Sequence, residues 1–501
     1  MRRLALLLAL FSLAAPGFAQ QSQTITVDAN APATPLPHFW EQMFGSGRAN
    51  LAMRADYRKD MRTVKSVTDF GYVRFHGILD DDNDVYSEDA QGNPVYNFSY
   101  VDQIYDGLLA EGVRPYVEIS FMPKALASRM DYQAFWYHPV VAPPKSYARW
   151  DALMTAFAKH LVDRYGIDEV SQWYFEVWNE PNLDFWAGVP KEQTYFELYD
   201  HTARALKAVS PRIRVGGPAT AQAAWVSDMI EHATKNHVPL DFVSSHVYGN
   251  DTAANVFKGG EAAPKQPIPP HEMVCVGIDK VHQEILHSAR PHIPLIWSEF
   301  NAAYDNEQQV TDSIYMGPWL ANTIRECDGK VQMMSYWTFS DVFEEQGVVK
   351  TPFYGGFGLI TEDDIPKPSF NAFAMLHELG DERIAEPEDD VIATKRKDGK
   401  LAIAVWNLVE PDAAGSGKTI TLDLQGVAPN AQVSIMRSDA QHGDTLDAWK
   451  KMGSPRYPTR EQIEALKKAS QPGPPEVTTL EGNKLTITVP PMGLAVVEVG
   501  K

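Results

Sequence analysis

Short apolar runs alternate with amphipathic stretches from about residue 38 to 380, and this repeat constrains the fold of the 501-residue chain more than any other feature. Apolar runs bounded by turns predict buried strands, and apolar residues at helical spacing predict helices. The predicted strands cover residues 39–44, 72–76, 114–120, 173–180, 213–217, 242–247, 294–299 and 331–339. The clearest predicted helices cover residues 147–165, 194–209, 225–235, 278–287, 312–327 and 370–379. Eight such units predict a (β/α)8 TIM barrel over residues 38–380, with functional residues at the C-terminal strand ends.

The pattern changes to a period of two after an acidic connector at residues 381–390, which predicts an antiparallel β-sandwich over residues 381–501. Residues 24–27 also alternate, so we expect segment 20–37 to add a strand to the sandwich. A helical insertion is predicted near residues 445–475, where Thr459 and Gln462 are spaced as a capping box.

The first 19 residues combine a short basic start, an apolar stretch and a small-residue finish, which is the pattern of a signal peptide. We therefore expect an exported protein, periplasmic or secreted. No later stretch approaches the run of about 20 apolar residues that a spanning helix needs, so no membrane span is expected.

Composition and charge limit the classes of molecule that the protein is expected to bind. A hydrophobic content of 44% with 22% charged residues is typical of a globular protein. The net charge of −20 repels phosphate backbones, which argues against a nucleic acid partner and favours an uncharged substrate. The oligomeric state is left open by the sequence.

The only two cysteines are Cys275 and Cys327. The helix prediction places Cys275 at the top of the barrel and Cys327 at the bottom of the next helix, roughly 20 Å or more apart, so no disulfide is expected. No Cys and His residues have the spacing of a zinc site, and no motif calls for a metal or a cofactor.

Two glutamates end predicted strands. Glu180 follows the aromatic run 173–178 within Asn179-Glu180-Pro181 and ends the fourth strand, and Glu299 ends the seventh. Two carboxyl groups at one end of a barrel suit hydrolysis of a glycosidic bond, in which one carboxyl protonates the leaving oxygen and the other acts from the opposite face of the sugar. Each glutamate on its own is equally compatible with a turn or a surface position.

Several polar residues at neighbouring strand ends are candidates to support this pair. We expect His246 and Tyr248 to donate hydrogen bonds to Glu299, with Arg74 as another donor, and we expect Glu176 to be a buried partner of Arg74. Purely structural roles for His246, Tyr248 and Arg74 remain open alternatives.

The loop that follows Trp337 combines acidic residues, among them Glu344 and Glu345, with aromatic residues. Aromatic rings stack on the apolar faces of sugars and carboxylates accept bonds from hydroxyls, so the loop suits a pocket for a terminal sugar. A solvated acidic loop is the alternative interpretation.

These motifs together resemble glycoside hydrolase family 39, and within it the β-xylosidases. The resemblance extends over nearly the whole mature chain and rests on YVRFHG at 72–77, FEVWNEPNL at 175–183, SHVY at 245–248, WSEF at 297–300, FEEQG at 343–347 and WKKMGSP at 449–455. It implies a barrel with an appended sandwich, retention of configuration, Glu180 as acid/base and Glu299 as nucleophile. It further implies that Asn179 binds the sugar 2-hydroxyl, and that His76, Glu345 and Glu344 hold the 3- and 4-hydroxyls.

The sequence therefore predicts a retaining, exo-acting hydrolase that releases terminal β-D-xylose from xylo-oligosaccharides by double displacement, without a cofactor. The alternatives are a β-glucosidase or another exo-glycosidase of the same family, and a catalytically silent carbohydrate-binding protein. An interaction module centred on the 445–475 insertion is a third, weaker alternative.

Overall fold

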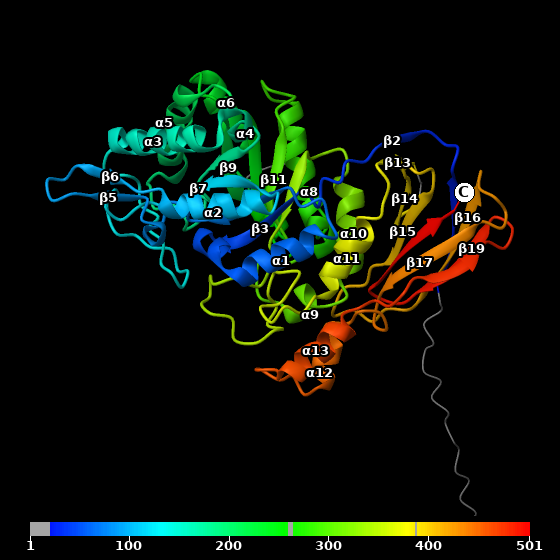
Figure 1. The fold of residues 1–501 in the computed structure, drawn as a ribbon. Coiled ribbons are helices and arrows are strands. Elements are labelled where there is room, and N and C mark those ends of the chain that lie inside the picture. Colours follow the sequence, from blue (N-terminus) through cyan, green and yellow to red (C-terminus); the bar gives the residue numbers. More distant parts are fainter. Residues whose placement is uncertain (1–20, 259–263, 386–387, 501) are drawn as a thin grey trace, which may run out of the picture.

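The computed structural model describes residues 21–258, 264–385 and 388–500, so the predicted signal peptide lies outside the described residues. A barrel surrounded by helices occupies one side of the molecule and a layered β domain the other (Figure 1). This is the predicted fold class, a (β/α)8 barrel with an antiparallel sandwich.

Eight parallel strands close the barrel in the order β10-β11-β12-β3-β4-β7-β8-β9. Their bounds are β3 Met43–Arg48, β4 Tyr72–His76, β7 Arg114–Ile119, β8 Tyr174–Val177, β9 Arg214–Ala221, β10 Phe242–His246, β11 Leu295–Phe300 and β12 Met333–Tyr336. All eight predicted strands overlap these, but the first prediction, 39–44, began four residues early and shares only two residues with β3. Gly45 and Gly47 weaken the strand pattern there, but glycine is needed because a Cβ on Gly45 would meet the Trp337 ring at 2.2 Å.

The helices pack around the barrel and bury its outer apolar surface. Their bounds are α1 Ala55–Lys65, α2 Ser99–Ala110, α3 Tyr147–Tyr165, α4 Ile167–Val170, α5 Lys191–Val209, α6 Val226–Lys235, α7 Ala253–Val256, α8 Pro270–Leu286, α9 Gln308–Thr311, α10 Met316–Cys327 and α11 Pro368–Leu376. Two short 3₁₀ helices, η1 Ala49–Met53 and η2 Asp81–Asn83, and a ribbon of β5 Tyr86–Glu88 with β6 Pro94–Tyr96 complete this part. Within the described ranges, no helix is both long and apolar enough to cross a membrane.

The sandwich stacks a seven-stranded sheet, in the order β18-β17-β20-β15-β14-β13-β2, on a three-stranded sheet, β1-β16-β19. The strands are β1 Gln21–Asp28, β2 Ala33–Pro35, β13 Glu382–Ile384, β14 Val391–Lys395, β15 Leu401–Asn407, β16 Lys418–Gln425, β17 Gln432–Ser438, β18 Glu476–Thr479, β19 Lys484–Val489 and β20 Gly493–Val499. The N-terminal strand β1 pairs with β16 in parallel, so both ends of the described chain contribute to this domain. Alternating inward residues of the two sheets form a separate apolar core.

The insertion between β17 and β18 forms two helices, α12 Thr445–Lys451 and α13 Arg460–Ala469. The predicted capping box is present: the Thr459 hydroxyl accepts from the Gln462 backbone and the Gln462 side chain accepts from the Thr459 backbone. Trp449 of α12 packs against Phe353, with ring centroids 5.5 Å apart. The insertion therefore packs against the loop that follows β12, and this contact joins the insertion to the barrel domain.

The expectation that the two cysteines stay unpaired was wrong, because Cys275 and Cys327 form a disulfide with a Cα–Cα distance of 5.2 Å. The error lies in the helix start: α8 begins at Pro270, not at 278, so Cys275 lies well inside it. Helices α8 and α10 run side by side but staggered, as the hydrogen bond of 3.3 Å from the Asn322 amide to the His271 carbonyl shows. The stagger brings the last residue of α10 level with the second turn of α8.

Candidate active site

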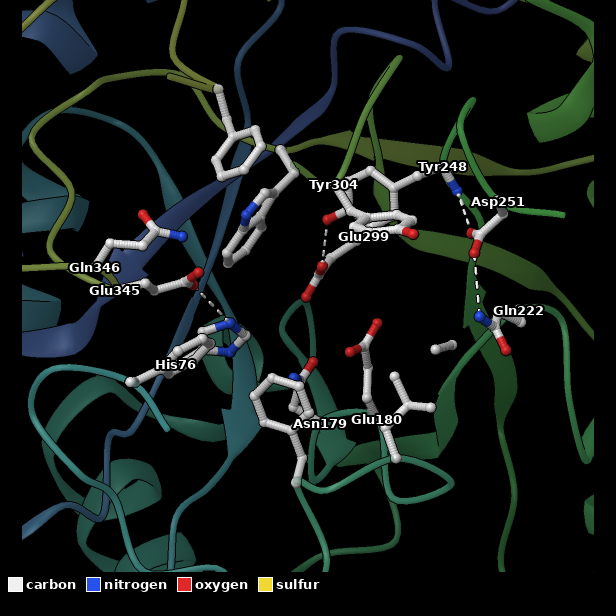
Figure 2. Close-up of a pocket in the computed structure, with 16 residues that line it drawn as sticks. His76, Asn179, Glu180, Gln222, Tyr248, Asp251, Glu299, Tyr304, Glu345 and Gln346 are labelled. Carbon is white, nitrogen blue, oxygen red and sulfur yellow. Dashed lines mark hydrogen bonds and ion pairs between the residues drawn. The ribbon is translucent and has the colours of Figure 1, made fainter. Parts of the chain in front are cut away.

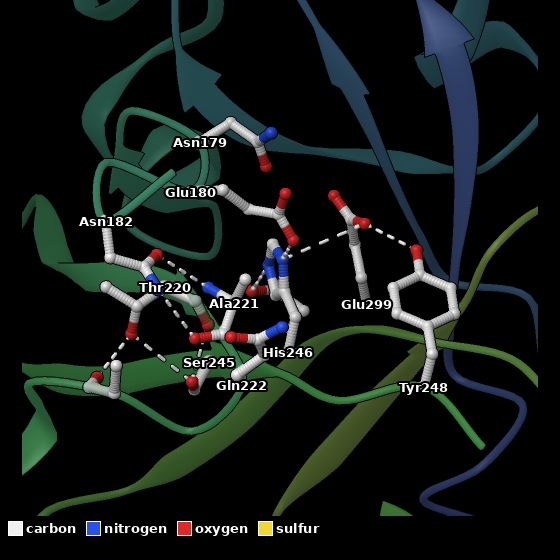
Figure 3. A network of polar contacts seen from close by, with 12 residues as sticks. Asn179, Glu180, Asn182, Thr220, Ala221, Gln222, Ser245, His246, Tyr248 and Glu299 are labelled. Atoms are coloured by element: carbon white, nitrogen blue, oxygen red, sulfur yellow. Dashed lines mark hydrogen bonds and ion pairs between the residues drawn. The ribbon is translucent and has the colours of Figure 1, made fainter. Parts of the chain in front are cut away.

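The chain turns sharply at the end of β8, and this turn presents Glu180. Trp178 and Glu180 both have left-handed backbone conformations, with φ of 72° and 43°, which are uncommon for residues with side chains. The turn is held across β9: the Glu180 N–H donates to the Ala219 carbonyl at 2.8 Å, and the Asn182 side chain exchanges hydrogen bonds with the Ala221 backbone at 2.9 and 3.0 Å (Figure 3). The carboxyl group is thus fixed before any substrate binds.

Glu299, near the end of β11, faces Glu180 across a cavity of about 400 Å³ (Figure 2). One carboxyl oxygen of each glutamate and a ring nitrogen of His246 all lie within 4.8 Å of one another. Aromatic side chains wall the cavity, namely Phe135, Phe185, Tyr248, Tyr304, Trp337 and Phe357. The Trp337 ring also contacts the His76 ring at a centroid distance of 4.8 Å. The cavity therefore combines facing carboxyl groups with apolar walls.

Arg74 organises the floor of this cavity. Its fully buried guanidinium donates to Glu176 at 2.6 Å, to Glu299 at 2.5 Å and to the Asn179 Oδ1 at 2.9 Å, and it is 2.8 Å from Glu118. The predicted contacts of Arg74 with Glu176 and Glu299 are therefore present. Because Oδ1 of Asn179 is occupied, its NH₂ group remains to donate toward the cavity.

Glu118 was missed by the sequence reasoning. It pairs in register with Glu176 on the adjacent strand, so the two carboxylates lie at one level inside the barrel. The spacing of both glutamates before the ends of their strands was a usable indication, because alternate residues of a barrel strand face inward.

Glu299 carries the donors expected of an ionised group. The Tyr248 hydroxyl donates to its Oε2 at 2.7 Å, opposite the Arg74 contact on Oε1. Burial raises the pKa of Glu299, while the charges of Arg74 and His76 and the Tyr248 hydrogen bond lower it. As a result of these opposing effects, the pKa of Glu299 is raised less than that of Glu180.

Burial raises the pKa of Glu180 well above its usual range, and the negative charge of Glu299 raises it further. A proton shared between the two carboxyl groups therefore resides on Glu180, since charge on Glu299 is stabilised by Arg74 and Tyr248. This division matches an acid facing a carboxylate.

His246 does not bond Glu299 as expected. Its Nδ1 lies 3.0 Å from Glu180 Oε1 and 3.8 Å from Glu299 Oε2, and its Nε2 lies 3.0 Å from the Ser298 hydroxyl (Figure 3). The reason is the turn after β8, which carries Glu180 across β9 toward the end of β10. Burial and the nearby Arg74 and His76 charges lower the pKa of His246 well below its usual value, so it is a neutral partner of the acid.

His76 and Glu345 form the opposite wall. Burial lowers the pKa of His76, but Glu118, at 2.8 Å, outweighs this and raises it to about 10, so the ring is cationic at neutral pH. Glu345 Oε1 lies 3.5 Å from His76 Nε2, close enough for charge attraction but without hydrogen-bond geometry. Within the described chain, this buried oxygen has no hydrogen-bond donor, so it is open to a substrate hydroxyl.

Glu344 does not line the cavity, contrary to the sequence expectation. Its carboxylate turns away to Arg48 and Arg54, at 3.0 and 3.3 Å. The chain turns directly after Glu344, where the Gly347 N–H donates to the Glu344 carbonyl at 3.2 Å, and this turn brings Glu345 to the cavity while Glu344 stays outside it. The following residue, Gln346, lines the cavity instead.

Asp251 and Gln222 are further cavity residues that the sequence did not indicate. Asp251 accepts from the Tyr248 N–H at 2.9 Å and from the Gln222 amide at 3.2 Å, which links the loops after β9 and β10. Both lie in irregular segments without a periodic pattern, so no sequence feature distinguishes them.

Two groups of side chains in this cavity are close enough to hold a metal ion, one of Glu180, His246 and Glu299 and one of His76, Glu118 and Glu299. Arg74 forms ion pairs with Glu118 and Glu299, the protonated His76 pairs with Glu118, and burial favours the protonated form of Glu180. The charges of this site therefore favour proton transfer and nucleophilic attack by side chains.

A buried acid facing a carboxylate at the C-terminal end of a β/α barrel, between aromatic walls, defines a glycoside hydrolase. The chain belongs to the glycosyl hydrolases family 39, whose family model matches residues 23–482. It is 40% identical over 453 residues to a β-xylosidase of Geobacillus stearothermophilus, covering 88% of each chain. It is 38% identical over 459 residues to a β-xylosidase of Caldicellulosiruptor saccharolyticus, covering 89% of this chain and 91% of that one. The solved structure of a GH39 β-xylosidase from Caulobacter crescentus superposes with a TM-score of 0.83 at 33% identity, covering 96% of this chain and 100% of that one.

Proposed function

We propose that this protein is a retaining, exo-acting β-xylosidase that releases terminal β-D-xylose from xylo-oligosaccharides. The observation that carries the proposal is the approach of the Glu180 and Glu299 carboxyl oxygens to within 4.8 Å. Retaining enzymes hold their carboxyl groups about 5–5.5 Å apart, whereas inverting enzymes leave about 6.5–9.5 Å for a water molecule. The short approach supports direct attack on the sugar by one of the two.

In the first step, Glu299 attacks the anomeric carbon while the bond to the leaving oxygen breaks and Glu180 donates its proton to that oxygen. The products are a xylosyl ester on Glu299 and the oligosaccharide shortened by one xylose, which leaves with a free hydroxyl group. In the second step, Glu180 takes a proton from water, the water oxygen attacks the anomeric carbon, and Glu299 leaves as a carboxylate. Arg74 and Tyr248 stabilise the charge on Glu299 before the first step and after the second.

The xyloside preference is supported by the names of the relatives and by the polar groups of the cavity. The Asn179 amide is left free to donate, the His76 imidazolium donates, and the Glu345 carboxylate accepts. We assign Asn179 to the 2-hydroxyl, and His76 with Glu345 to the hydroxyls farther from the bond that breaks. Trp337 provides an apolar face for the ring.

Hydrolysis of 4-nitrophenyl β-xyloside by the wild type, Glu180→Ala and Glu299→Ala tests the assignment. Both variants should lose activity by several orders of magnitude, while Glu284→Ala, which removes a half-buried glutamate of α8 outside the cavity, should not. Azide should rescue Glu180→Ala with a β-xylosyl azide as product, and Glu299→Ala with the inverted α-product. Equal or faster turnover of the matching β-glucoside would refute the preference for xylosides. An α-xylosyl azide from Glu180→Ala would refute the assignment of Glu180 as acid/base and Glu299 as nucleophile.

We further propose that the chain is exported, on the basis of its N-terminal pattern. The Cys275–Cys327 disulfide supports this, because disulfides persist in oxidising compartments. Mass spectrometry of the N-terminus of protein recovered from the periplasm or medium should show cleavage after about residue 19. Recovery of uncleaved chain from the cytoplasm alone would refute export.

A further inference from the structure

Four side chains that the catalytic site does not use converge at the opposite end of the barrel. One ligand atom from each of His38, Glu41, Asp69 and His377 lies within 4.8 Å of the others. His38 and Glu41 precede β3, Asp69 precedes β4, and His377 directly follows α11. These positions are at the N-terminal ends of parallel strands and at the end of a returning helix, hence at the face away from Glu180 and Glu299.

Glu41 is the centre of the cluster and is fully buried. The Nδ1 atoms of both histidines approach the same carboxylate oxygen, His38 at 2.5 Å and His377 at 2.9 Å. No Lys or Arg forms an ion pair with Glu41 anywhere in the described chain. A buried carboxylate normally requires a cationic partner or a metal ion, and here only two imidazoles surround it.

One group of the cluster has unused bonding capacity on the side of the cavity. The Nδ1 of His38, which is 8% exposed, already faces Glu41, and its Nε2, which has no hydrogen-bond partner among the described residues, lies on the other side of the ring. Asp69 forms no hydrogen bond or ion pair with any residue that the structure describes, although it is exposed. His38, Asp69 and His377 line a cavity of about 360 Å³, which gives an ion a path from solvent.

Two imidazoles and two carboxylates are ligands that suit a borderline divalent ion such as Zn²⁺, whereas Mg²⁺ prefers oxygen ligands alone. Ligand distances of about 2.0–2.2 Å in a tetrahedron require about 3.3 Å between ligand atoms. The Nδ1-to-oxygen distances of 2.5 to 3.1 Å need only small side-chain rotations to reach this spacing. Glu299 in the catalytic cavity differs, because Arg74 already forms an ion pair with it at 2.5 Å.

We propose that His38, Glu41, Asp69 and His377 form a structural site for a divalent transition metal ion, for which zinc is the representative. The ion replaces the protons shared between the imidazoles and Glu41. It joins the segment before β3, the loop before β4 and the end of α11, and so fastens the first and last units of the barrel. The sequence lacks a zinc motif because the ligands come from three segments far apart in the chain.

The full-length protein is first treated with a chelator to remove bound metal, and the chelator is then removed. The resulting protein should bind one equivalent of Zn²⁺ in calorimetry. Co²⁺ in its place should give the visible absorption bands of a four-coordinate site, Zn²⁺ should raise the melting temperature by a few degrees, and Mg²⁺ should do neither. Because the site lies at the far end of the barrel, hydrolysis of the aryl xyloside should be unchanged.

Asp69→Asn and His377→Ala remove ligands that are exposed or half-buried, so both variants should fold, which circular dichroism checks. Each should weaken Zn²⁺ binding at least tenfold and abolish the thermal shift. The control is His442→Ala, which breaks a His–Asp pair of 2.7 Å in the other domain and should bind as the wild type does. Absence of binding, equal affinity in all variants, or inhibition of hydrolysis in step with Zn²⁺ binding would each overturn the site.

Discussion

The Tyr248 hydroxyl is predicted to set the lower pH limit of activity. It donates to Glu299 Oε2 at 2.7 Å in a buried site and lowers the pKa of that carboxyl. A hydrogen bond to a charged group contributes about 1.5–3 kcal/mol, and 1.36 kcal/mol corresponds to about one pKa unit. Because Arg74 remains on the other oxygen, Tyr248→Phe should raise the pKa of Glu299 by about one unit.

Glu299 must be ionised to attack, so activity is lost as pH falls through its pKa. Raising that pKa moves the acid limb of kcat/KM to higher pH by about one unit, whereas removal of a binding contact alone would scale the profile without moving it. The assay is a pH profile of kcat/KM with 4-nitrophenyl β-xyloside for the wild type and Tyr248→Phe.

Tyr315→Phe is the matched control, because it removes a 2.9 Å bond from a tyrosine to Glu410 outside the catalytic cavity. Its profile should coincide with that of the wild type. An acid limb that stays in place in Tyr248→Phe, or that moves to lower pH, would refute the role of this hydroxyl in stabilising the Glu299 charge.

Three further predictions follow from the polar contacts and the disulfide. Glu345→Gln should raise KM for the xyloside about tenfold, because a charged acceptor worth about 1.4 kcal/mol is lost. Glu344→Gln, the matched control, should leave KM nearly unchanged, because Glu344 faces away from the cavity. Steady-state kinetics compare the two variants, and equal effects on KM would contradict the conclusion that only Glu345 points inward. Arg74→Met should destabilise the fold by about 3–5 kcal/mol in denaturant unfolding, because it leaves buried carboxylates unpaired, and a neutral result would contradict that account. The double variant Cys275→Ser, Cys327→Ser should lose about 4 kcal/mol of unfolding free energy, by the loop-entropy argument for a separation of 52 residues. A wild type whose unfolding free energy is unchanged when its disulfide is reduced would refute this estimate.

The barrel was predictable because its evidence is local. Each strand is a short apolar run and each helix has its own period, so the eight units can be counted without any long-range contact. Glu180 and Glu299 were found the same way, since a strand end is visible in sequence and the C-terminal ends of barrel strands meet at one face.

The side-chain partners at the site were only partly predictable. Tyr248 and Arg74 contact Glu299 as expected, but His246 bonds Glu180 and Glu344 leaves the pocket. These outcomes depend on the left-handed turn that carries Glu180 across β9 and on the direction of each loop residue. Neither is encoded in a periodic pattern.

Spacing along the chain carries enough information to predict the eight β/α units, the change to a second domain and the two carboxyl groups of the site. The family resemblance already implied that Glu180 is the acid, but the physical cause is visible only in three dimensions: burial of Glu180 beside a Glu299 that Arg74 and Tyr248 hold in its charged form. Only the tertiary structure joined Cys275 to Cys327, and only it gathered the His38 cluster. The physical reason is the same in each case: pKa values, disulfides and ligand sets depend on distances of a few ångströms between residues that the chain separates by tens to hundreds of positions.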